Sequence, residues 1–142
     1  MDAQYLMLEL TESLVMENPE EAVKTLNQLI GLELKLSIDD FGTGYSSLSY
    51  LKRFPLHELK IDRSFLKDIT TDWEDRALVS AMIYLAHEFN LKVVAEGIEK
   101  QEQLDILASL GCDEYQGYFF SRPVSALDLT PILFELNTGV MA

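Results

Sequence analysis

A strand-like pattern followed by a helix-like pattern recurs five times along this chain of 142 residues, and this alternation constrains the fold most. Within 32–39, leucine or isoleucine alternates with polar residues, which predicts a strand of about seven residues. Asn18 and Pro19 are typical of a helix start, and Gly31 of a helix end. The predicted strands are 5–11, 32–39, 58–62, 91–96 and 114–118, and the predicted helices are 19–30, 46–54, 72–89, 100–110 and 125–136.

Strict alternation with short connections predicts an α/β fold whose strands are parallel. Both an open doubly wound sheet and a closed (β/α)8 barrel have this order. Polar residues end nearly every predicted strand, and side chains that converge from many strand ends are how barrel enzymes build a site. These residues, which favour the barrel, are Glu9, Asp39 with Asp40, Lys60, Glu96 and Gln116.

The longest predicted helix, 72–89, carries an apolar stripe that we expect to be buried. Its residues are Ala77, Leu78, Ala81, Met82, Leu85, Ala86 and Phe89. We also expect Trp73 and Tyr84 to be packing residues rather than a platform for a cofactor.

Asp39 and Asp40 lie where the predicted strand 32–39 breaks into a loop containing Gly42 and Gly44. Adjacent carboxylates repel each other unless a proton or a cation intervenes. Oxygen-rich sites suit Mg2+, Mn2+ or Ca2+, so the pair is a candidate metal site. The alternative is that Asp-Asp before glycine simply opens a turn.

The composition excludes some classes of function. The net charge of −13 argues against binding to nucleic-acid polymers or to anionic membranes, both of which need a basic surface. The lone cysteine, Cys112, is expected to be a small core residue and fits a reducing, cytoplasmic compartment. No apolar run approaches a membrane span, and the first ten residues do not resemble a signal peptide.

Each polar strand end also has a structural interpretation. Glu9 could be a solvated strand end, Lys60 the partner of a buried acid, Glu96 a helix cap, and Gln116 a partner of the backbone. Together they suggest different chemistry. Carboxylates can hold a pair of divalent cations that activate water for attack on phosphorus, and a lysine nearby can orient that water.

Five segments carry a resemblance to the EAL family of cyclic di-GMP phosphodiesterases. They are ELTES (9–13), DDFGTGYSS (39–47), LKID (59–62), VVAEGIE (93–99) and QGYFFSRP (116–123). Their order and spacing match the family along nearly the whole chain. The resemblance implies a (β/α)8-type barrel, with one antiparallel strand in the family. It also implies a site for two Mg2+ or Mn2+ ions that hydrolyses cyclic di-GMP to linear pGpG.

The resemblance also implies a role for each matching residue. Glu9, Asp39 and Asp40 match metal ligands, with Asp39 bridging both ions. Glu96 matches a catalytic residue and ligand of the second metal, and Lys60 matches the catalytic lysine that contacts the attacking water. Three further residues complete the match: Gln116 as an amide near the substrate and water, Glu12 as the anchor of the loop after Asp40, and Glu99 as a supporting acid. That loop, 41–47, couples metal binding to dimerisation in the family.

The chain also departs from the family. The Glu-Ala-Leu signature and an asparagine ligand, both N-terminal to ELTES in the family, are absent. A complete barrel has about eight strands, so five β/α units suggest the C-terminal portion of an EAL domain over 1–136, with a frayed tail at 137–142. We therefore expect weak or no turnover, and a homodimer or another association through exposed barrel edges.

Two alternatives remain at this stage. One is a non-catalytic EAL-like module that binds nucleotide or a protein. The other is an unrelated metal-dependent barrel enzyme of the enolase-like kind, which the loop 39–47 and the segment QGYFF make less consistent with the sequence.

Overall fold

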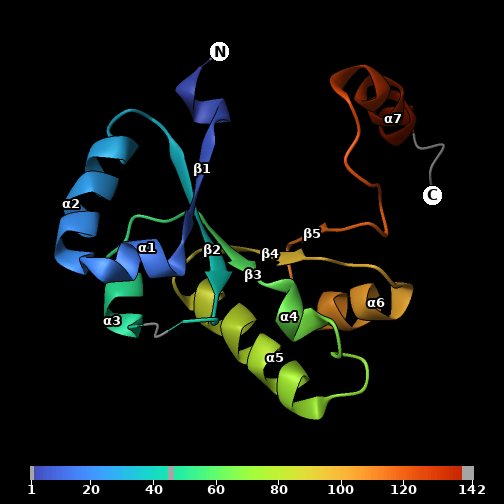
Figure 1. The fold of residues 1–142 in the computed structure, drawn as a ribbon, viewed down its shortest axis with the longest axis horizontal. Helices are drawn as coiled ribbons and strands as arrows, with labels where there is room; N and C mark the ends of the chain where they lie inside the picture. The colour runs from blue at the N-terminus through green and yellow to red at the C-terminus, as the bar shows by residue number, and fades with distance from the viewer. Residues whose placement is uncertain (1, 45–46, 139–142) are drawn as a thin grey trace.

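The computed structural model describes residues 2–44 and 47–138, which form a five-stranded sheet with helices (Figure 1). The strands are β1 (Met7–Thr11), β2 (Lys35–Phe41), β3 (Glu58–Ile61), β4 (Lys92–Glu96) and β5 (Glu114–Gln116). The helices are a 3-10 turn η1 (Ala3–Tyr5), then α1 (Glu12–Glu17), α2 (Pro19–Ile30), α3 (Leu48–Leu51), α4 (Arg63–Leu66), α5 (Trp73–Glu88), α6 (Gln101–Ser109) and α7 (Ala126–Thr138). The strands follow one another in the order β1-β2-β3-β4-β5, and every pair is parallel, which confirms the predicted α/β fold and its partial barrel.

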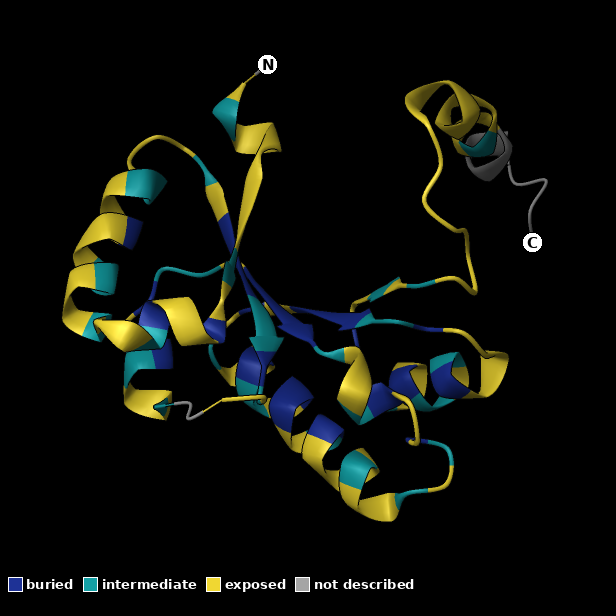
Figure 2. Cartoon of the chain, in the orientation of Figure 1, coloured by how far each residue is buried: buried dark blue, intermediate teal, exposed yellow. Residues whose placement is uncertain are grey.

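The two faces of the sheet differ in chemistry. One face packs on the helices, and its strand residues are fully buried: Leu36, Ile38, Leu59, Ile61, Val93 and Ala95. The core lies between this face and helices α2, α5 and α6, which contribute Leu26, Val79, Ile83 and Leu107, among others. Figure 2 shows the buried residues concentrated in the middle of the sheet and along the inner sides of the helices.

The opposite face, called here the inner face, carries mostly polar residues. Ser37, Glu58 and Lys60 lie on it and are buried. The Ser37 hydroxyl donates to Glu58 Oε1 at 3.0 Å, and burial raises the pKa of Glu58, an effect that this hydrogen bond opposes. Lys92 Nζ pairs with Glu114 Oε1 at 2.8 Å near the start of β4 and β5.

Strand β2 contains a bulge at the two aspartates and continues to Phe41, whereas the predicted strand ended at Asp39. Ile38 pairs with Leu59 and Phe41 with Ile61, so Asp39 and Asp40 together lie opposite Lys60. Asp40 takes a left-handed conformation with φ of 55°. Aspartate tolerates this conformation better than most residues, and bulges beside functional sites redirect side chains.

Several predicted boundaries differ from the structure. Strand β2 begins at Lys35 rather than near Leu32, because the chain must first turn away from α2, and Glu33 takes φ of 63° in that turn. Helix α3 covers only 48–51 of the predicted 46–54, and residues 45 and 46 lie outside the described residues. Two short helices, α1 and α4, were not predicted, because helices of one or two turns leave little periodic pattern.

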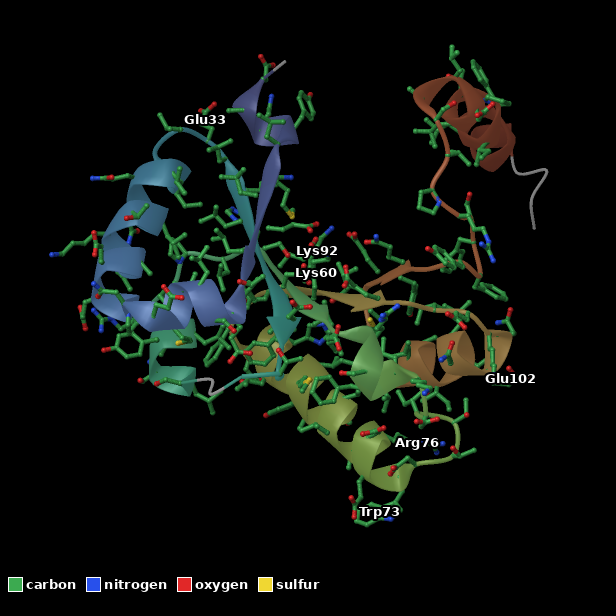
Figure 3. The ribbon with its side chains drawn as sticks, in the orientation of Figure 1. Glu33, Lys60, Trp73, Arg76, Lys92 and Glu102 are labelled. Carbon is green, nitrogen blue, oxygen red and sulfur yellow. The ribbon has the colours of Figure 1, made fainter. Side chains whose placement is uncertain are left out.

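The predicted buried stripe of α5 is confirmed at Met82 and Ala86, with Leu85 and Phe89 partly buried, but it is wrong in the first half of the helix. Val79, Met82, Ile83 and Ala86 are buried, whereas Ala77, Leu78 and Ala81 are exposed. Adjacent faces of this helix are both apolar, so the period alone could not select between them. Trp73 and Tyr84 were expected to pack, but they are 74% and 68% exposed, and Figure 3 shows Trp73 at the outer end of α5.

Helix α7 lies apart from the sheet at the end of an extended segment (Figure 1). From Ala126 to Phe134, every residue except Ile132 is exposed. The helix continues to Thr138, two residues into the predicted frayed tail, and 139–142 lie outside the described residues. Among the described helices, none combines the length and apolar character that crossing a membrane requires.

Candidate active site

Lys60 is the centre of the candidate site. It lies in β3, whose four residues are all buried, in the central part of the molecule (Figure 3). Lys60 Nζ contacts Glu9 Oε1 of β1 at 2.9 Å and Glu96 Oε1 of β4 at 2.5 Å. One ammonium thus links acids from two strands that are not neighbours in the sheet.

The charge on Lys60 is stabilised by these partners. Burial by itself would lower the pKa of Lys60, but the hydrogen bonds to Glu96 and Glu9 outweigh burial and raise the pKa above its ordinary value. Asp39 adds to this effect through its negative charge. Lys60 is therefore an ammonium at neutral pH, suited to orient a polar ligand or to neutralise negative charge and not to act as a base.

Asp39 and Asp40 bring two more carboxylates to the same place. The backbone N–H of Asp40 donates to Asp39 Oδ1 at 2.8 Å. Burial, followed by repulsion from Asp39 and Asp62, raises the pKa of Asp40, while the charge of Lys60 lowers it. The bulge in β2 therefore gathers negative charge that a cation would stabilise.

Glu12 holds the segment that follows the two aspartates. It is almost fully buried at the start of α1, and its Oε2 accepts a hydrogen bond from the Gly42 N–H at 2.9 Å. Gly42 has φ of 93°, and a Cβ there would lie 2.3 Å from the terminal methyl of Met82. The positive φ at position 42 therefore favours glycine, and any side chain there would also have to displace the end of Met82.

Glu99 and Gln116 line an open cleft beside this cluster. The cleft has a volume of about 280 Å³, and its lining includes Glu96, Glu99, Gln116 and Tyr118. Gln116 ends β5 opposite Glu96 in the sheet register, and both Gln116 and Glu99 are exposed. The structure thus brings Glu96, Glu99 and Gln116 together along one cleft, while Glu12 lies apart from it under the Gly42 segment.

The sequence reasoning missed two residues of this cleft, Asp62 and Arg63. Asp62 directly follows β3, and its charge contributes to the raised pKa of Asp40. Its position after a strand was the same signal that identified Glu9 and Glu96. Arg63 lies against Gly97, where φ is 74° and a Cβ would lie 2.5 Å from Arg63 Cβ. No local pattern around either residue predicts this contact.

The donor set fits a divalent metal in its chemistry. Four carboxylates from three strands surround the Lys60 ammonium: Glu9, Asp39, Asp40 and Glu96. Mg2+, Mn2+ and Ca2+ prefer oxygen donors of this kind. Glu9 and Glu96 turn to Lys60, and Asp39 accepts from a backbone amide. Accordingly, within 2–44 and 47–138 no three acid, histidine or cysteine side chains are grouped closely enough to hold an ion.

The chain combines a parallel α/β barrel segment with acids and a lysine on its strands, which is the arrangement of a class of barrel enzyme sites. Comparison with known proteins identifies the family. A model of the EAL domain matches residues 1–123, and the chain belongs to the EAL domain family. Protein sll1895 of Synechocystis is 52% identical over 132 residues, covering 93% of this chain and 19% of that protein. The bifunctional diguanylate cyclase/cyclic di-GMP phosphodiesterase MucR of Pseudomonas aeruginosa is 46% identical over 129 residues, covering 91% of this chain and 19% of MucR.

Solved structures agree with this assignment. The MucR phosphodiesterase in complex with c-di-GMP superposes with a TM-score of 0.88 at 46% identity, covering 91% of this chain and 52% of that chain. Klebsiella pneumoniae BlrP1, in a complex with manganese and cyclic di-GMP, has a TM-score of 0.81 at 36% identity, covering 87% and 31%. The chain therefore spans about a fifth of the length of these curated relatives and about half of the solved MucR chain.

Proposed function

We propose that this chain forms part of a cyclic di-GMP phosphodiesterase site, in which two metal ions promote hydrolysis of one phosphodiester to give linear pGpG. The observation that carries the proposal is the position of Lys60 between Glu9 and Glu96, next to Asp39 and Asp40. The c-di-GMP complex of the similar MucR phosphodiesterase supports the choice of substrate.

Each residue has a role in the proposed reaction. Glu9, Asp39, Asp40 and Glu96 would hold the ions, which are Mg2+ or Mn2+ and supply an activated water and charge neutralisation. Lys60 holds its proton and orients the attacking water, and its positive charge stabilises the developing charge on phosphate oxygens. Gln116 and Glu99 contact the nucleotide or the water that surrounds it, along the cleft that they share with Glu96.

Turnover by this chain alone is expected to be weak or absent. The described acids approach Lys60 from β1, β2 and β4, and the β1 side of the cluster is open, with the Glu9 side chain 53% exposed. Water therefore reaches the reacting centre from one side, which weakens every electrostatic interaction in it.

Binding and turnover measured on the same sample test the proposal. Purified chain is titrated with cyclic di-GMP by calorimetry in the presence of Mn2+ and again with EDTA, and the products are separated by chromatography. We expect metal-dependent binding and slow formation of pGpG, both lost in Asp39→Asn. Metal-independent binding without any product would instead favour the non-catalytic nucleotide-binding module, and no binding in either condition would contradict the proposal.

We further propose that copies of the chain associate through the sheet edges. β1 pairs only with β2 and β5 only with β4 among the described strands, so each presents one unpaired row of backbone groups. Such edges promote pairing between chains. Sedimentation velocity over a hundredfold concentration range tests this: a growing fraction of dimers or larger species is expected, and a monomer that melts cooperatively at every concentration would contradict it.

A further inference from the structure

Two exposed side chains, Glu20 and Arg53, and the partly buried Tyr50 form a polar cluster separate from the ion pairs of Lys60. Arg53 donates two parallel hydrogen bonds to Glu20, from Nη1 to Oε1 at 2.7 Å and from Nη2 to Oε2 at 2.9 Å. The Tyr50 hydroxyl also donates to Glu20 Oε1, at 3.2 Å, and the Arg53 guanidinium lies 5.2 Å from the centre of the Tyr50 ring. We call Glu20, Tyr50 and Arg53 the Glu20 clamp.

The geometry of the clamp is stricter than that of an ordinary surface ion pair. A two-pronged contact between guanidinium and carboxylate fixes both position and orientation. The hydrogen bonds with Arg53 lower the pKa of Glu20, and the same contact raises the pKa of Arg53. Glu20 itself lies in the first turn of α2, which Pro19 and the Asn18 cap fix in place.

The clamp holds the far end of the segment that follows the two aspartates. The near end is held by Glu12, which accepts from the Gly42 N–H. Glu12 begins α1 and Glu20 lies in the first turn of α2, so two consecutive helices, separated at Asn18, contact Gly42 and Arg53 on either side of α3. Thr43 closes the first turn of that segment on Asp40, because its N–H and hydroxyl both donate to the Asp40 carbonyl.

Asp40 gives the clamp a consequence for the site. Its φ of 55° is unfavourable for a residue with a side chain, and such conformations persist only where the surroundings impose them. A segment held at both ends restricts the backbone of Asp40 more than a segment held at one end. Resting on the proposed function, we propose that Glu20 and Arg53 are positioning residues, which help to hold the Asp39-Asp40 bulge in the backbone conformation observed here.

The first test needs no metal. Amide hydrogen exchange is measured at Gly42. The Val93 N–H, which donates a hydrogen bond to Asp113 Oδ2, is the internal reference elsewhere in the fold. In Arg53→Glu, which sets two carboxylates against each other, we expect exchange at Gly42 to accelerate about threefold or more while Val93 stays unchanged. The charge-swapped double variant Glu20→Arg/Arg53→Glu should restore the protection of Gly42.

The control is a second exposed ion pair, the single contact of Lys92 with Glu114, at the opposite ends of β4 and β5. Lys92→Glu changes the net charge by the same amount as Arg53→Glu and should leave Gly42 unaffected. If Arg53→Glu does not fold, as judged by circular dichroism, Arg53→Gln and Tyr50→Phe remove parts of the same contacts. Unchanged exchange at Gly42 in folded clamp variants would overturn the proposal, as would an equal response to Lys92→Glu.

The second test measures Mn2+ affinity by electron paramagnetic resonance. Arg53→Glu adds negative charge, which alone would strengthen cation binding, so weaker binding would report loss of position. We expect its dissociation constant to rise about threefold or more, and that of Lys92→Glu not to rise. Equal affinity in wild type and Arg53→Glu would overturn the positioning role. If the wild type binds no Mn2+ while Gly42 still responds to Arg53→Glu, the proposed metal function fails and the mechanical role of the clamp stands.

Discussion

Replacing Lys60 by methionine tests the electrostatic description of the site most directly. The methionine keeps most of the buried apolar stem but removes the ammonium that contacts Glu9 and Glu96. The acids near it, which include Asp39 and Asp40, then face one another with no cation between them. The fold should tolerate the shape of the new side chain and lose stability through charge.

The size of the loss follows from the exposure of the partners. Removing one member of a buried ion pair costs about 3–5 kcal/mol, because the partner stays buried and unpaired. Lys60 and Glu96 have side chains only 5% and 21% exposed, but Glu9 is 53% exposed and water can solvate it. We therefore expect Lys60→Met to lower the free energy of unfolding by about 2–3 kcal/mol, below the range for a fully buried pair.

Urea unfolding at pH 7, followed by circular dichroism with and without Mn2+, measures this. Mn2+ should stabilise Lys60→Met more than the wild type, since a divalent cation can take over the charge that the ammonium provided. The double variant Lys60→Met/Glu96→Gln should recover about 1 kcal/mol of the loss, because the most buried of the unpaired charges is gone. A Lys60→Met protein as stable as the wild type in EDTA would refute the reasoning, as would equal stabilisation of both proteins by Mn2+.

Three further outcomes follow from other contacts. Gly97→Ala should destabilise the fold by about 2–3 kcal/mol in urea unfolding, because φ is positive and the new methyl would contact Arg63 of α4. The control Gly111→Ala, where φ is 83° but no atom lies within 4 Å, should cost only about 1 kcal/mol. Burial raises the pKa of Asp113, but the hydrogen bonds from His87 and the Val93 N–H outweigh burial and hold this pKa below its usual value. The resulting stabilisation is present above the pKa of Asp113 in the unfolded chain and is lost as pH falls through its pKa in the folded chain. Asp113→Asn should therefore flatten acid unfolding below about pH 4. Burial raises the pKa of Cys112 to about 11, so a disulfide reagent at pH 8 should label the native thiol far more slowly than the urea-unfolded thiol, and equal rates would contradict this burial.

The sequence was sufficient where one local signal determined one outcome. Helix α2 begins at Pro19 because Asn18 accepts from the Glu21 N–H, and both residues were visible as start signals. Asn90 takes φ of 58° just after α5, a left-handed conformation in which asparagine often ends a helix. The parallel order followed from the alternation of strands and helices, because short connections leave few other topologies.

The sequence was insufficient where two arrangements share one pattern. The face of α5 that is buried could not be chosen, since Leu78 and Val79 fit neighbouring stripes of the same period. The bulge in β2 depends on how β2 pairs with β3, which no window around Asp40 contains. For the same reason the Glu20 clamp was not predicted: Tyr50 and Arg53 are 30 and 33 residues from Glu20, and the contacts exist only in the folded chain.

The two unlike faces of the sheet determine how copies of this chain can meet. Stacking two sheets face to face would set Glu9, Glu58, Glu96 and Glu114 of one copy against the same acids of another, and like charges in contact are repulsive. The helix-covered face has no strand surface left to offer. The proposed association is therefore expected to occur in the plane of the sheet, strand beside strand, an arrangement that leaves the polar inner face uncovered.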